Sequence, residues 1–390
     1  MTSVSQFYKN PDGSSLPTGN GLYPSVEFDP HNPNHNVACP YVVYAHGSAA
    51  RTITIELYNP VSRAISGMFT ASQVTFTRTT HSPNVVYTLT PTPASQAISI
   101  PSLGRTTVSV DVSGLPDFVC AGSFSLSWEA NCEPDDSGGG TIGETLYLVD
   151  ATPAGWMSTP WAEVLNLACA WADGKSGKLD CLQYCTKGLY HSAMFYYHND
   201  TLNQIDDSTN GDGTPKDSYG KFKLSSMFAN ASPPAYGWAD CRDTSAFLLL
   251  CTSALGYDGT LTQVYVPGTD SNGNPTEQIF ETNSLLPIGR TGSYFQSDWG
   301  FHQFFEASGS SVYDACAAQA VDLSGAAYNE VPFAWARAGF WQTAIGSGYA
   351  GLASGLEPSP PNLATPTFGS SLVRGPLDAI TSKQILEGVE

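Results

Sequence analysis

Residues 236–257 read YGWADCRDTSAFLLLCTSALGY, and this stretch organises the C-terminal two thirds of the chain. Two prolines and Gly237 keep the approach to it non-helical. Asp240 is a good N-cap, and apolar residues then recur at the i, i+3, i+4, i+7 spacing of a buried helical face. Gly256 is suited to end the helix as its C′ residue. The stretch therefore predicts a loop that turns into a helix, with Cys241 in the first helical turn.

This position gives Cys241 a chemical environment of its own. The helix macrodipole and the unbonded backbone N–H groups of a first turn favour a thiolate. The same N–H groups can hold an oxyanion. A nucleophilic cysteine also needs a general base, and the base needs a group that orients it.

Two downstream segments supply a candidate base and its orienting group. They read DWGFHQFFE at 298–306 and SVYDA at 311–315, and they look like the two strands of a hairpin. A three-residue loop at 307–309 places His302 directly opposite Asp314, on the same face of the sheet. A four-residue loop would turn Asp314 to the other face.

These motifs together resemble a known family. The pattern G-x-x-x-C-R-D-x-S-A before an apolar helix ending in L-G-Y, a later W-x-x-H and then V-Y-D is similar to the bacterial transglutaminase-like domain, a papain-related fold, over residues 150–330. Members are thiol peptidases, amidases or transamidating cross-linkers. The resemblance implies that Cys241, His302 and Asp314 form the catalytic triad. The chain departs from the common pattern at Phe304, Ala315 and Thr244.

The expected chemistry is acyl transfer on an amide of a protein or peptide substrate. His302 takes the thiol proton and forms an ion pair with Cys241, while Asp314 fixes the imidazole tautomer. The thiolate forms a thioester, which water or another amine resolves. The oxyanion would bind the Cys241 backbone N–H and one donor from Trp238 or Tyr236. A peptidase or amidase and a protein-glutamine transamidase share all these residues, so both remain open.

Non-catalytic functions are the other alternative. The chain can be a surface or carbohydrate-binding module on the same fold, since its eight Trp and 19 Tyr could line a sugar groove. No pair of carboxylates stands out at a spacing usable for glycoside hydrolysis.

Composition limits the partners. The 390 residues include 16 Lys and Arg against 35 Asp and Glu, a net charge of −19, which argues against nucleic acids or anionic membranes bound by charge. No apolar stretch is long enough to span a membrane. No signal peptide is visible at the N-terminus, so the expectation is a cytoplasmic protein, one exported by a non-standard route, or one whose leader was replaced. The oligomeric state is left open.

The predicted organisation is α+β in five segments. Period-two alternation with turn signals predicts an antiparallel, immunoglobulin-like β-sandwich at 37–132. It follows an extended N-terminal arm at 1–36. A Gly/Asp-rich linker at 133–144 then leads to the transglutaminase-like catalytic domain at 145–357, and a C-terminal tail occupies 358–390.

Within the catalytic domain, helices are expected from about Pro160 and over 178–197, where Tyr190 and Tyr197 are interpreted as core residues. A strand is expected at 262–266. In the sandwich, His46 has no evident partner and is interpreted as structural.

Metal sites and disulfides are weakly indicated. Asp270, Asn272, Asn274 and Glu281 have the spacing of a calcium loop but lack its glycine, so ordinary Asx turns are favoured and no cofactor is expected. Nine cysteines leave at least one free thiol, for which Cys241 is the candidate. The possible pairings are Cys39 with Cys120 or Cys132, and Cys181 with Cys185 or Cys169.

Overall fold

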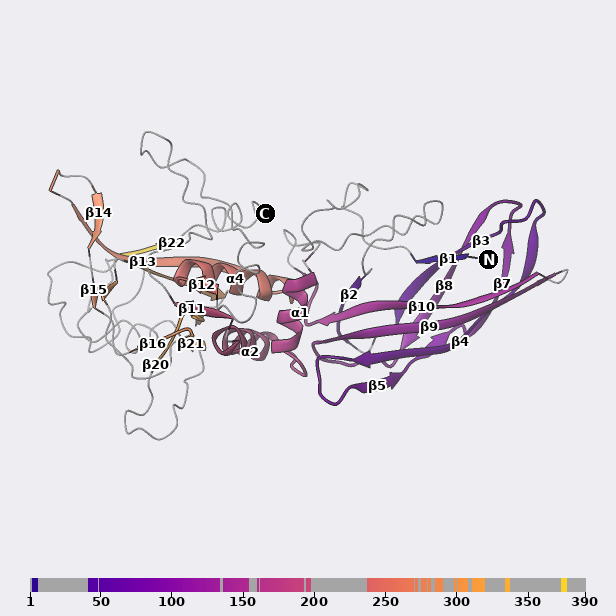
Figure 1. Ribbon diagram of the computed structural model, residues 1–390, viewed down its shortest axis with the longest axis horizontal. Coiled ribbons are helices and arrows are strands. Elements are labelled where there is room, and N and C mark those ends of the chain that lie inside the picture. The colour runs from indigo at the N-terminus through magenta and orange to yellow at the C-terminus, as the bar shows by residue number, and fades with distance from the viewer. Residues whose placement is uncertain are drawn as a thin grey trace. The chain divides into compact units, whose positions relative to one another are not determined.

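The computed structural model describes residues 2–5, 41–47, 49–133, 136–153, 160, 162–192, 194–197, 237–269, 271–272, 275–278, 280–281, 285–289, 298–299, 301–307, 311–319, 334–336 and 373–376. The chain forms two compact units (Figure 1). Unit 1 comprises residues 1–153, 157–178 and 254–256, and unit 2 comprises the remainder. Each unit is described by itself.

Unit 1 is mostly antiparallel β-structure. Its strands are β1 (Thr2–Ser5), β2 (Tyr41–Ala45), β3 (Arg51–Tyr58), β4 (Ile65–Arg78), β5 (Val85–Thr88), β6 (Thr90–Thr92), β7 (Ser95–Ile100), β8 (Arg105–Ser113), β9 (Cys120–Glu133) and β10 (Asp136–Val149), followed by helix α1 (Ala162–Trp171).

The strands of unit 1 form a β-sandwich with the strand order of an immunoglobulin-like domain. One sheet has the order β1-β3-β8-β6 and the other β2-β10-β9-β4-β5, with β7 also paired to β4. In immunoglobulin nomenclature, the sheet β1-β3-β8-β6 corresponds to strands A-B-E-D. In the other sheet, β4, β9 and β10 correspond to strands C, F and G. The predicted sandwich is confirmed, and period-two alternation was the signal that predicted it.

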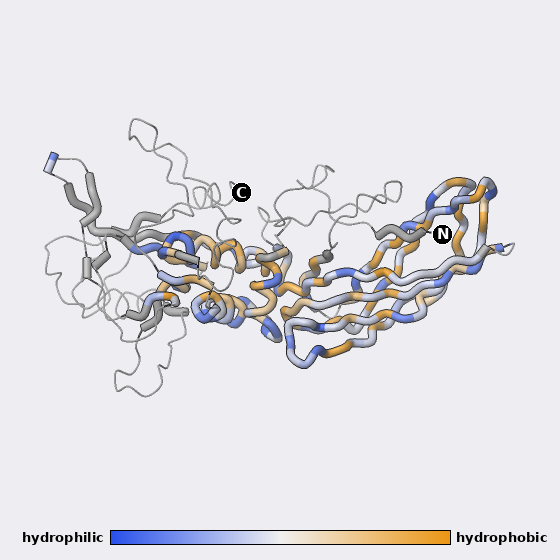
Figure 2. The backbone as a smooth tube through the Cα atoms, in the orientation of Figure 1, coloured by the Kyte–Doolittle hydropathy of each residue, from blue (hydrophilic) through white to orange (hydrophobic). Residues whose placement is uncertain are grey.

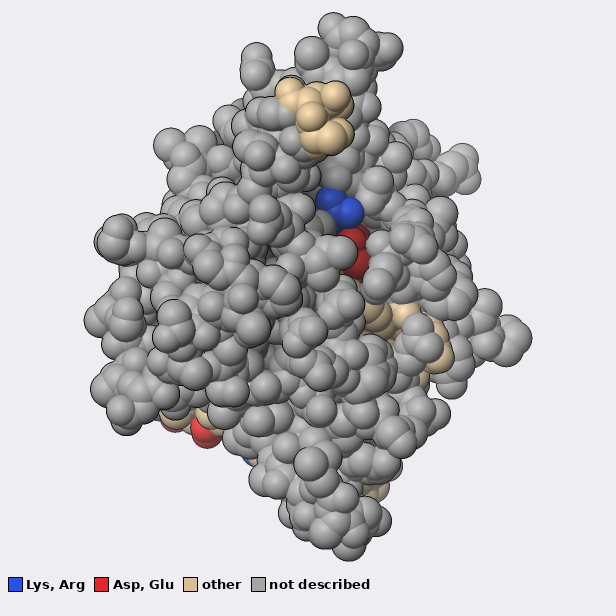
Figure 3. All heavy atoms as spheres, turned by 90° about the vertical axis from the view of Figure 1, so that its left-hand side faces the viewer, with Lys and Arg blue, Asp and Glu red and all other residues tan. Residues whose placement is uncertain are grey.

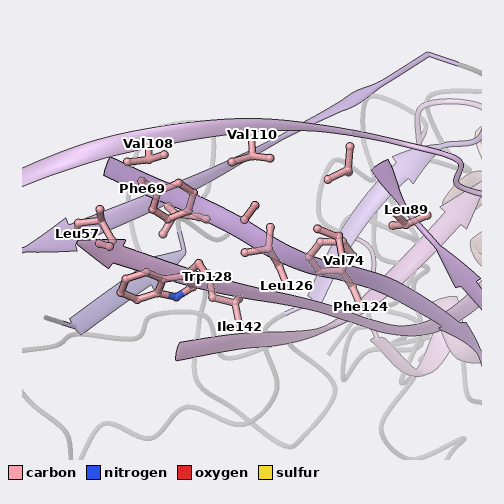
Figure 4. Packing of buried hydrophobic residues seen from close by; sticks show 14 of the residues in the cluster. Leu57, Phe69, Val74, Leu89, Val108, Val110, Phe124, Leu126, Trp128 and Ile142 are labelled. Carbon is pink, nitrogen blue, oxygen red and sulfur yellow. The ribbon is translucent and has the colours of Figure 1, made fainter. Parts of the chain in front are cut away.

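The core of the sandwich lies between its two sheets. Apolar and polar residues alternate along the strands (Figure 2), so that one face of each sheet turns inward. Phe69 stacks on Trp128 with ring centroids 5.9 Å apart, and Val108, Val110 and Leu126 also point into the core (Figure 4).

The predicted linker at 133–144 is wrong, because most of it belongs to strand β10. Asp136 pairs with Cys132 and the antiparallel ladder continues to Leu148, opposite Cys120. Gly138, Gly139 and Gly140 fall within this ladder. Glycine retains its backbone N–H and C=O groups, so a glycine-rich segment can complete a hairpin when it faces a regular strand such as β9. The predicted catalytic domain at 145–357 therefore begins too early.

Polar contacts attach the segments around α1 to the sandwich. Arg78 forms an ion pair with Asp173, to which Thr80 also donates a hydrogen bond. His46, interpreted from the sequence as a residue without a partner, has two: Nδ1 lies 3.0 Å from an oxygen of Asp117 and Nε2 lies 2.6 Å from one of Asp150. The sequence could not reveal these contacts because the residues are far apart along the chain.

Unit 2 combines helices with a mixed set of sheets. The elements are α2 (Lys178–His191), β11 (Phe195–Tyr197), β12 (Gly237–Ala239), α4 (Cys241–Ala254), β13 (Gly259–Thr269), β14 (Pro275–Gln278), β15 (Phe280–Glu281), β16 (Leu285–Pro287), β17 (Asp298–Trp299), β18 (Phe301–Ala307), β19 (Ser311–Tyr313), β20 (Ala317–Gln319), β21 (Ala334–Ala336) and β22 (Val373–Pro376).

The largest sheet of unit 2 has the order β14-β13-β18-β19-β21, and β22 also pairs with β13. The expected strand at 262–266 is thus part of β13. The helix expected over 178–197 is wrong at its end, because β11 replaces its last turn and pairs in parallel with β12. Tertiary pairing overrides helical propensity at this point.

The predicted arm and tail are described only in part. Residues 2–5 form strand β1, which pairs with β3, and residues 373–376 form β22. The rest of 1–36 and of 358–390 lies outside the described residues, as does Cys39. The other eight cysteines are buried, and Cys181 forms a disulfide with neither Cys185 nor Cys169, so the pairings suggested for it are wrong. Within the described ranges, no helix is long and apolar enough to cross a membrane.

Candidate active site

The first turn of α4 is held by a reciprocal capping arrangement around Cys241. Asp240 Oδ1 accepts hydrogen bonds from the backbone N–H groups of Arg242 at 2.8 Å and Asp243 at 3.0 Å. In return, Asp243 Oδ2 accepts a hydrogen bond from the Asp240 backbone N–H at 3.1 Å. This is a capping box with Asp at its fourth position. The predicted N-cap is confirmed, and Cys241 is the first helical residue.

The other end of α4 is also as expected. Gly256 has a φ of +100°, and the Tyr257 N–H donates to the Thr252 carbonyl at 2.9 Å. These are features of a Schellman motif, in which a glycine takes the left-handed conformation. The helix therefore has sequence-defined caps at both ends, which fix where Cys241 lies on it.

The hairpin that carries His302 and Asp314 forms, but the predicted register is wrong. Ala307 pairs with Ser311 and Phe305 with Tyr313, whereas a loop at 307–309 would have paired Glu306 with Ser310. Continuing this register sets Asp314 beside Phe304 and diagonal to His302. A shift of two residues leaves every side chain on its original face. For this reason His302 and Asp314 still share a face of the sheet.

His302 and Asp314 are directly hydrogen-bonded. His302 Nε2 lies 2.8 Å from Asp314 Oδ2, and both side chains are buried, with exposures of 1% and 4%. An ionised carboxylate only accepts hydrogen bonds, so Nε2 carries the proton. The second oxygen, Asp314 Oδ1, accepts from the Cys316 backbone N–H at 2.8 Å. Both carboxylate oxygens therefore have a donor, which fixes the orientation of the imidazole ring.

The Cys241 thiol lies against β18 at the residue next to His302. The backbone of Gln303 lowers the pKa of the Cys241 thiol, which sets the two groups next to each other. The Gln303 side chain in turn donates to Ser245 Oγ at 2.8 Å, and Ser245 is one turn further along α4. These two contacts of one residue join the helix of Cys241 to the strand of His302.

The structure alters the expected state of the thiol. Burial raises the pKa of Cys241 well above its ordinary value, and the negative charge of Asp240 raises it further; the Gln303 hydrogen bond and Arg242 act in the opposite direction. This direction is opposite to the one expected from the helix dipole alone. The physical reason is that desolvation outweighs the favourable helix dipole.

Several predicted site residues lie outside what the structure describes. Tyr236 is not described, and Trp238 is described only as part of the backbone of β12. In the suggested calcium loop, Asp270 and Asn274 are not described, Asn272 is exposed, and only the backbone of Glu281 is placed. Among the described residues, no group of three or more His, Cys, Asp or Glu side chains could hold a metal ion.

Sequence reasoning missed Gln303, Ser245 and Cys316. Each is almost fully buried. A weak signal existed for the first two: Ser245 is the serine of the motif G-x-x-x-C-R-D-x-S-A, and Gln303 adjoins His302 and the apolar pair that follows it. Cys316 contributes its backbone N–H to Asp314, a role that no side-chain pattern can reveal.

On the face shown in Figure 3, a basic and an acidic side chain of the described residues adjoin. One such pair near the site is Arg242 with Asp240, whose Nε and Oδ2 are 3.2 Å apart.

Comparison with known proteins gives only distant likenesses. No protein-family model and no curated protein matches the chain. A PapD-like domain of human CEP192 is 14% identical over 28% of this chain and 82% of that chain, with a TM-score of 0.21. The periplasmic chaperone SfaE is 11% identical over 28% of this chain and 53% of that chain, with a TM-score of 0.18.

A family 123 glycoside hydrolase from Clostridium perfringens is 10% identical over 32% of this chain and 25% of that chain, with a TM-score of 0.20. None of these three structures is described as transglutaminase-like. Scores this low carry no argument about what the chain does.

Proposed function

We propose that the chain is a cysteine-nucleophile acyltransferase that acts on amide bonds of a protein or peptide substrate. The observation that carries the proposal is the buried hydrogen bond of 2.8 Å between His302 and Asp314. His302 lies on strand β18, and the backbone of the next residue, Gln303, adjoins the Cys241 thiol. A thiol, an imidazole and a carboxylate in this order are the parts of a nucleophile–base–orienter triad.

The proposed reaction begins from a neutral thiol. Because Nε2–H donates its hydrogen bond to Asp314, Nδ1 of His302 is the nitrogen that takes the thiol proton as Cys241 attacks the carbonyl carbon. The carbonyl π electrons move to oxygen to give a tetrahedral oxyanion. When they return, the C–N bond breaks, the amine leaves with the proton from His302, and a thioester remains on Cys241.

The thioester is then resolved by one of two nucleophiles. Water gives a carboxylic acid and makes the enzyme a thiol peptidase or amidase. A second amine gives a new amide, as in protein-glutamine transamidation. Hydrolysis and transamidation use the same triad residues, so only an experiment that offers both acceptors distinguishes them.

The test uses the full chain and an acyl donor that reports the nucleophile whatever the substrate preference. An activated p-nitrophenyl ester of a glutamine-containing peptide is offered with and without a fluorescent primary amine. We expect rapid acylation at Cys241, followed by hydrolysis or amine transfer, in the wild type. We expect both to be lost in Cys241→Ser. The matched control is Cys251→Ser, because Cys251 is another buried thiol on the same helix.

The proposal is overturned if Cys241→Ser releases p-nitrophenol as fast as the wild type, or if the wild type shows no acylation above the Cys241→Ser background. The second result would favour a non-catalytic binding module on the same fold.

A further inference from the structure

Tyr197 is placed by its strand at the same end of unit 2 as Cys241. Strand β11 pairs in parallel with β12, and Tyr197 is aligned with Ala239, two residues before Cys241. The chain leaves β12 at this end and enters α4 directly. The sequence alone indicated a core residue on a helix, and this alignment was not predictable from it.

A ring contact shows which face of β11 is turned toward α4. Phe195 packs edge-on against Phe247 of α4, with ring centroids 6.2 Å apart and an interplanar angle of 73°. Side chains two residues apart on a strand project from the same face. Tyr197 therefore projects from the α4-facing side of β11.

The distances along α4 and β11 place Tyr197 near the first turn of α4. Phe247 is six residues after Cys241, a distance of about 9 Å along a helix axis. Tyr197 is two residues beyond Phe195 in the direction of the Cys241 end, which is about 6.6 Å along a strand. If Phe195 lies beside Phe247, the Tyr197 side chain is directed at the N-terminal turn that carries Cys241.

The electrostatic surroundings of Tyr197 agree with this placement. Burial raises the pKa of Tyr197, and the nearby acidic groups of Cys316, Cys241, Asp240 and Asp314 raise it further. The side chain is 9% exposed. At neutral pH the phenol therefore keeps its proton and remains a hydrogen-bond donor.

We propose that the Tyr197 hydroxyl is a catalytic residue that donates a hydrogen bond to the oxyanion formed when Cys241 attacks an amide carbonyl. This inference rests on the proposed function. The carbonyl π electrons move to oxygen, which accepts hydrogen bonds from the Tyr197 hydroxyl and the Cys241 backbone N–H; no proton leaves the tyrosine. Tyr197 thus fills the role for which Trp238 and Tyr236 were the candidates from sequence.

The test compares Tyr197→Phe with Tyr190→Phe, because Tyr190 is another buried tyrosine of unit 2, on helix α2. Removing one oxyanion donor lowers kcat by roughly 100-fold. We expect that loss in Tyr197→Phe, with KM changed less than about threefold and Tyr190→Phe close to wild type in kcat.

A second readout is alkylation of Cys241 by iodoacetamide, a displacement that forms no oxyanion. Its rate should be the same in Tyr197→Phe as in the wild type.

Unchanged kcat in Tyr197→Phe would overturn the proposal and make Tyr197 a core residue. Equal losses of acylation and alkylation would also overturn it, because they would show that Tyr197 acts on the thiol or on folding. Failure of the proposed function is separable, since in that case either Cys241→Ser retains the activity or the wild type shows none. Failure of the present inference instead leaves an activity that depends on Cys241 and that Tyr197→Phe does not lower.

Discussion

Asp314 is the residue on which the geometry of the candidate site depends. One of its oxygens bonds to His302 and the other to the backbone N–H of Cys316. Substituting Asp314→Asn keeps the shape but offers an amide where the imidazolium needs a negative charge. We expect kcat for the activated ester to fall by about 1,000-fold or more. In contrast, Asp258→Asn changes an exposed turn residue of unit 2 and should leave kcat within about twofold. Comparable activity of the two variants would contradict the assigned role.

The pH dependence of Cys241 alkylation follows from the direction of its pKa shift. Burial and Asp240 raise that pKa, so less thiolate is present at neutral pH than in an ordinary cysteine. The iodoacetamide rate should therefore rise through the alkaline range without a plateau near neutrality. Asp240→Asn retains an N-cap residue but removes the negative charge, which lowers the pKa of Cys241. Its rate profile should move to lower pH, and an unshifted profile would refute this explanation.

The sequence predicts which residues cap the helix and bond to one another better than it predicts their protonation. Asp240 as the cap and Gly256 as the helix end follow from local chemistry, and the pairing of His302 with Asp314 follows from strand alternation. The protonation of Cys241 does not follow, because it depends on burial by segments distant in sequence. The same reason explains why the partners of His46 and the position of Tyr197 were missed.

Among the structural elements, the β9–β10 hairpin gives the clearest test of the sandwich. A Cβ at Gly122 of β9 would lie 2.1 Å from the Thr77 carbonyl oxygen, whereas at Gly143 of β10 the nearest atom is 4.0 Å away. Gly122→Ala should therefore lower the free energy of unfolding by about 1–3 kcal/mol. Gly143→Ala should change it by less than about 0.5 kcal/mol. Urea unfolding of both variants measures this difference, and equal stabilities would show that the strands are not packed as described.

Elements with strong periodicity were predictable and those with ambiguous composition were not. The strands β3 and β8 and the helix α4 follow directly from their apolar spacing. The glycines of β10 suggest a linker when read locally, yet pairing along the whole of β9 makes them a strand. Similarly, residues 195–197 continue a helical pattern but pair with β12. In both cases a partner strand outside the local window decides the outcome.

At the scale of the whole molecule, the chain has two compact units with separate cores. Leu126 is fully buried in the sandwich core, and Leu126→Ala should cost about 2–5 kcal/mol in that unit's stability. Leu103→Ala is the control, because Leu103 is 59% exposed. We expect only Leu126→Ala to lower the unfolding midpoint of unit 1, with alkylation of Cys241 in unit 2 unaffected under native conditions. Loss of Cys241 reactivity in this variant would contradict separate cores.

The two-domain organisation was predictable from length and from the change of pattern along the chain. The boundary was not, since unit 1 takes in β10 and α1, which the sequence assigned to the linker and to the catalytic domain. Compact units are defined by contacts in space, and contacts between distant segments leave no mark on local composition.

The proposed mechanism requires that the acyl group be on Cys241 after the first turnover. Mass-spectrometric mapping of the chain after brief exposure to the activated peptide ester gives this directly. We expect the acyl group on Cys241 in the wild type, and we expect acylation to be slowed by about 100-fold or more in His302→Asn. An adduct spread over other cysteines, or formed on Cys241 equally fast without the imidazole of His302, would contradict it.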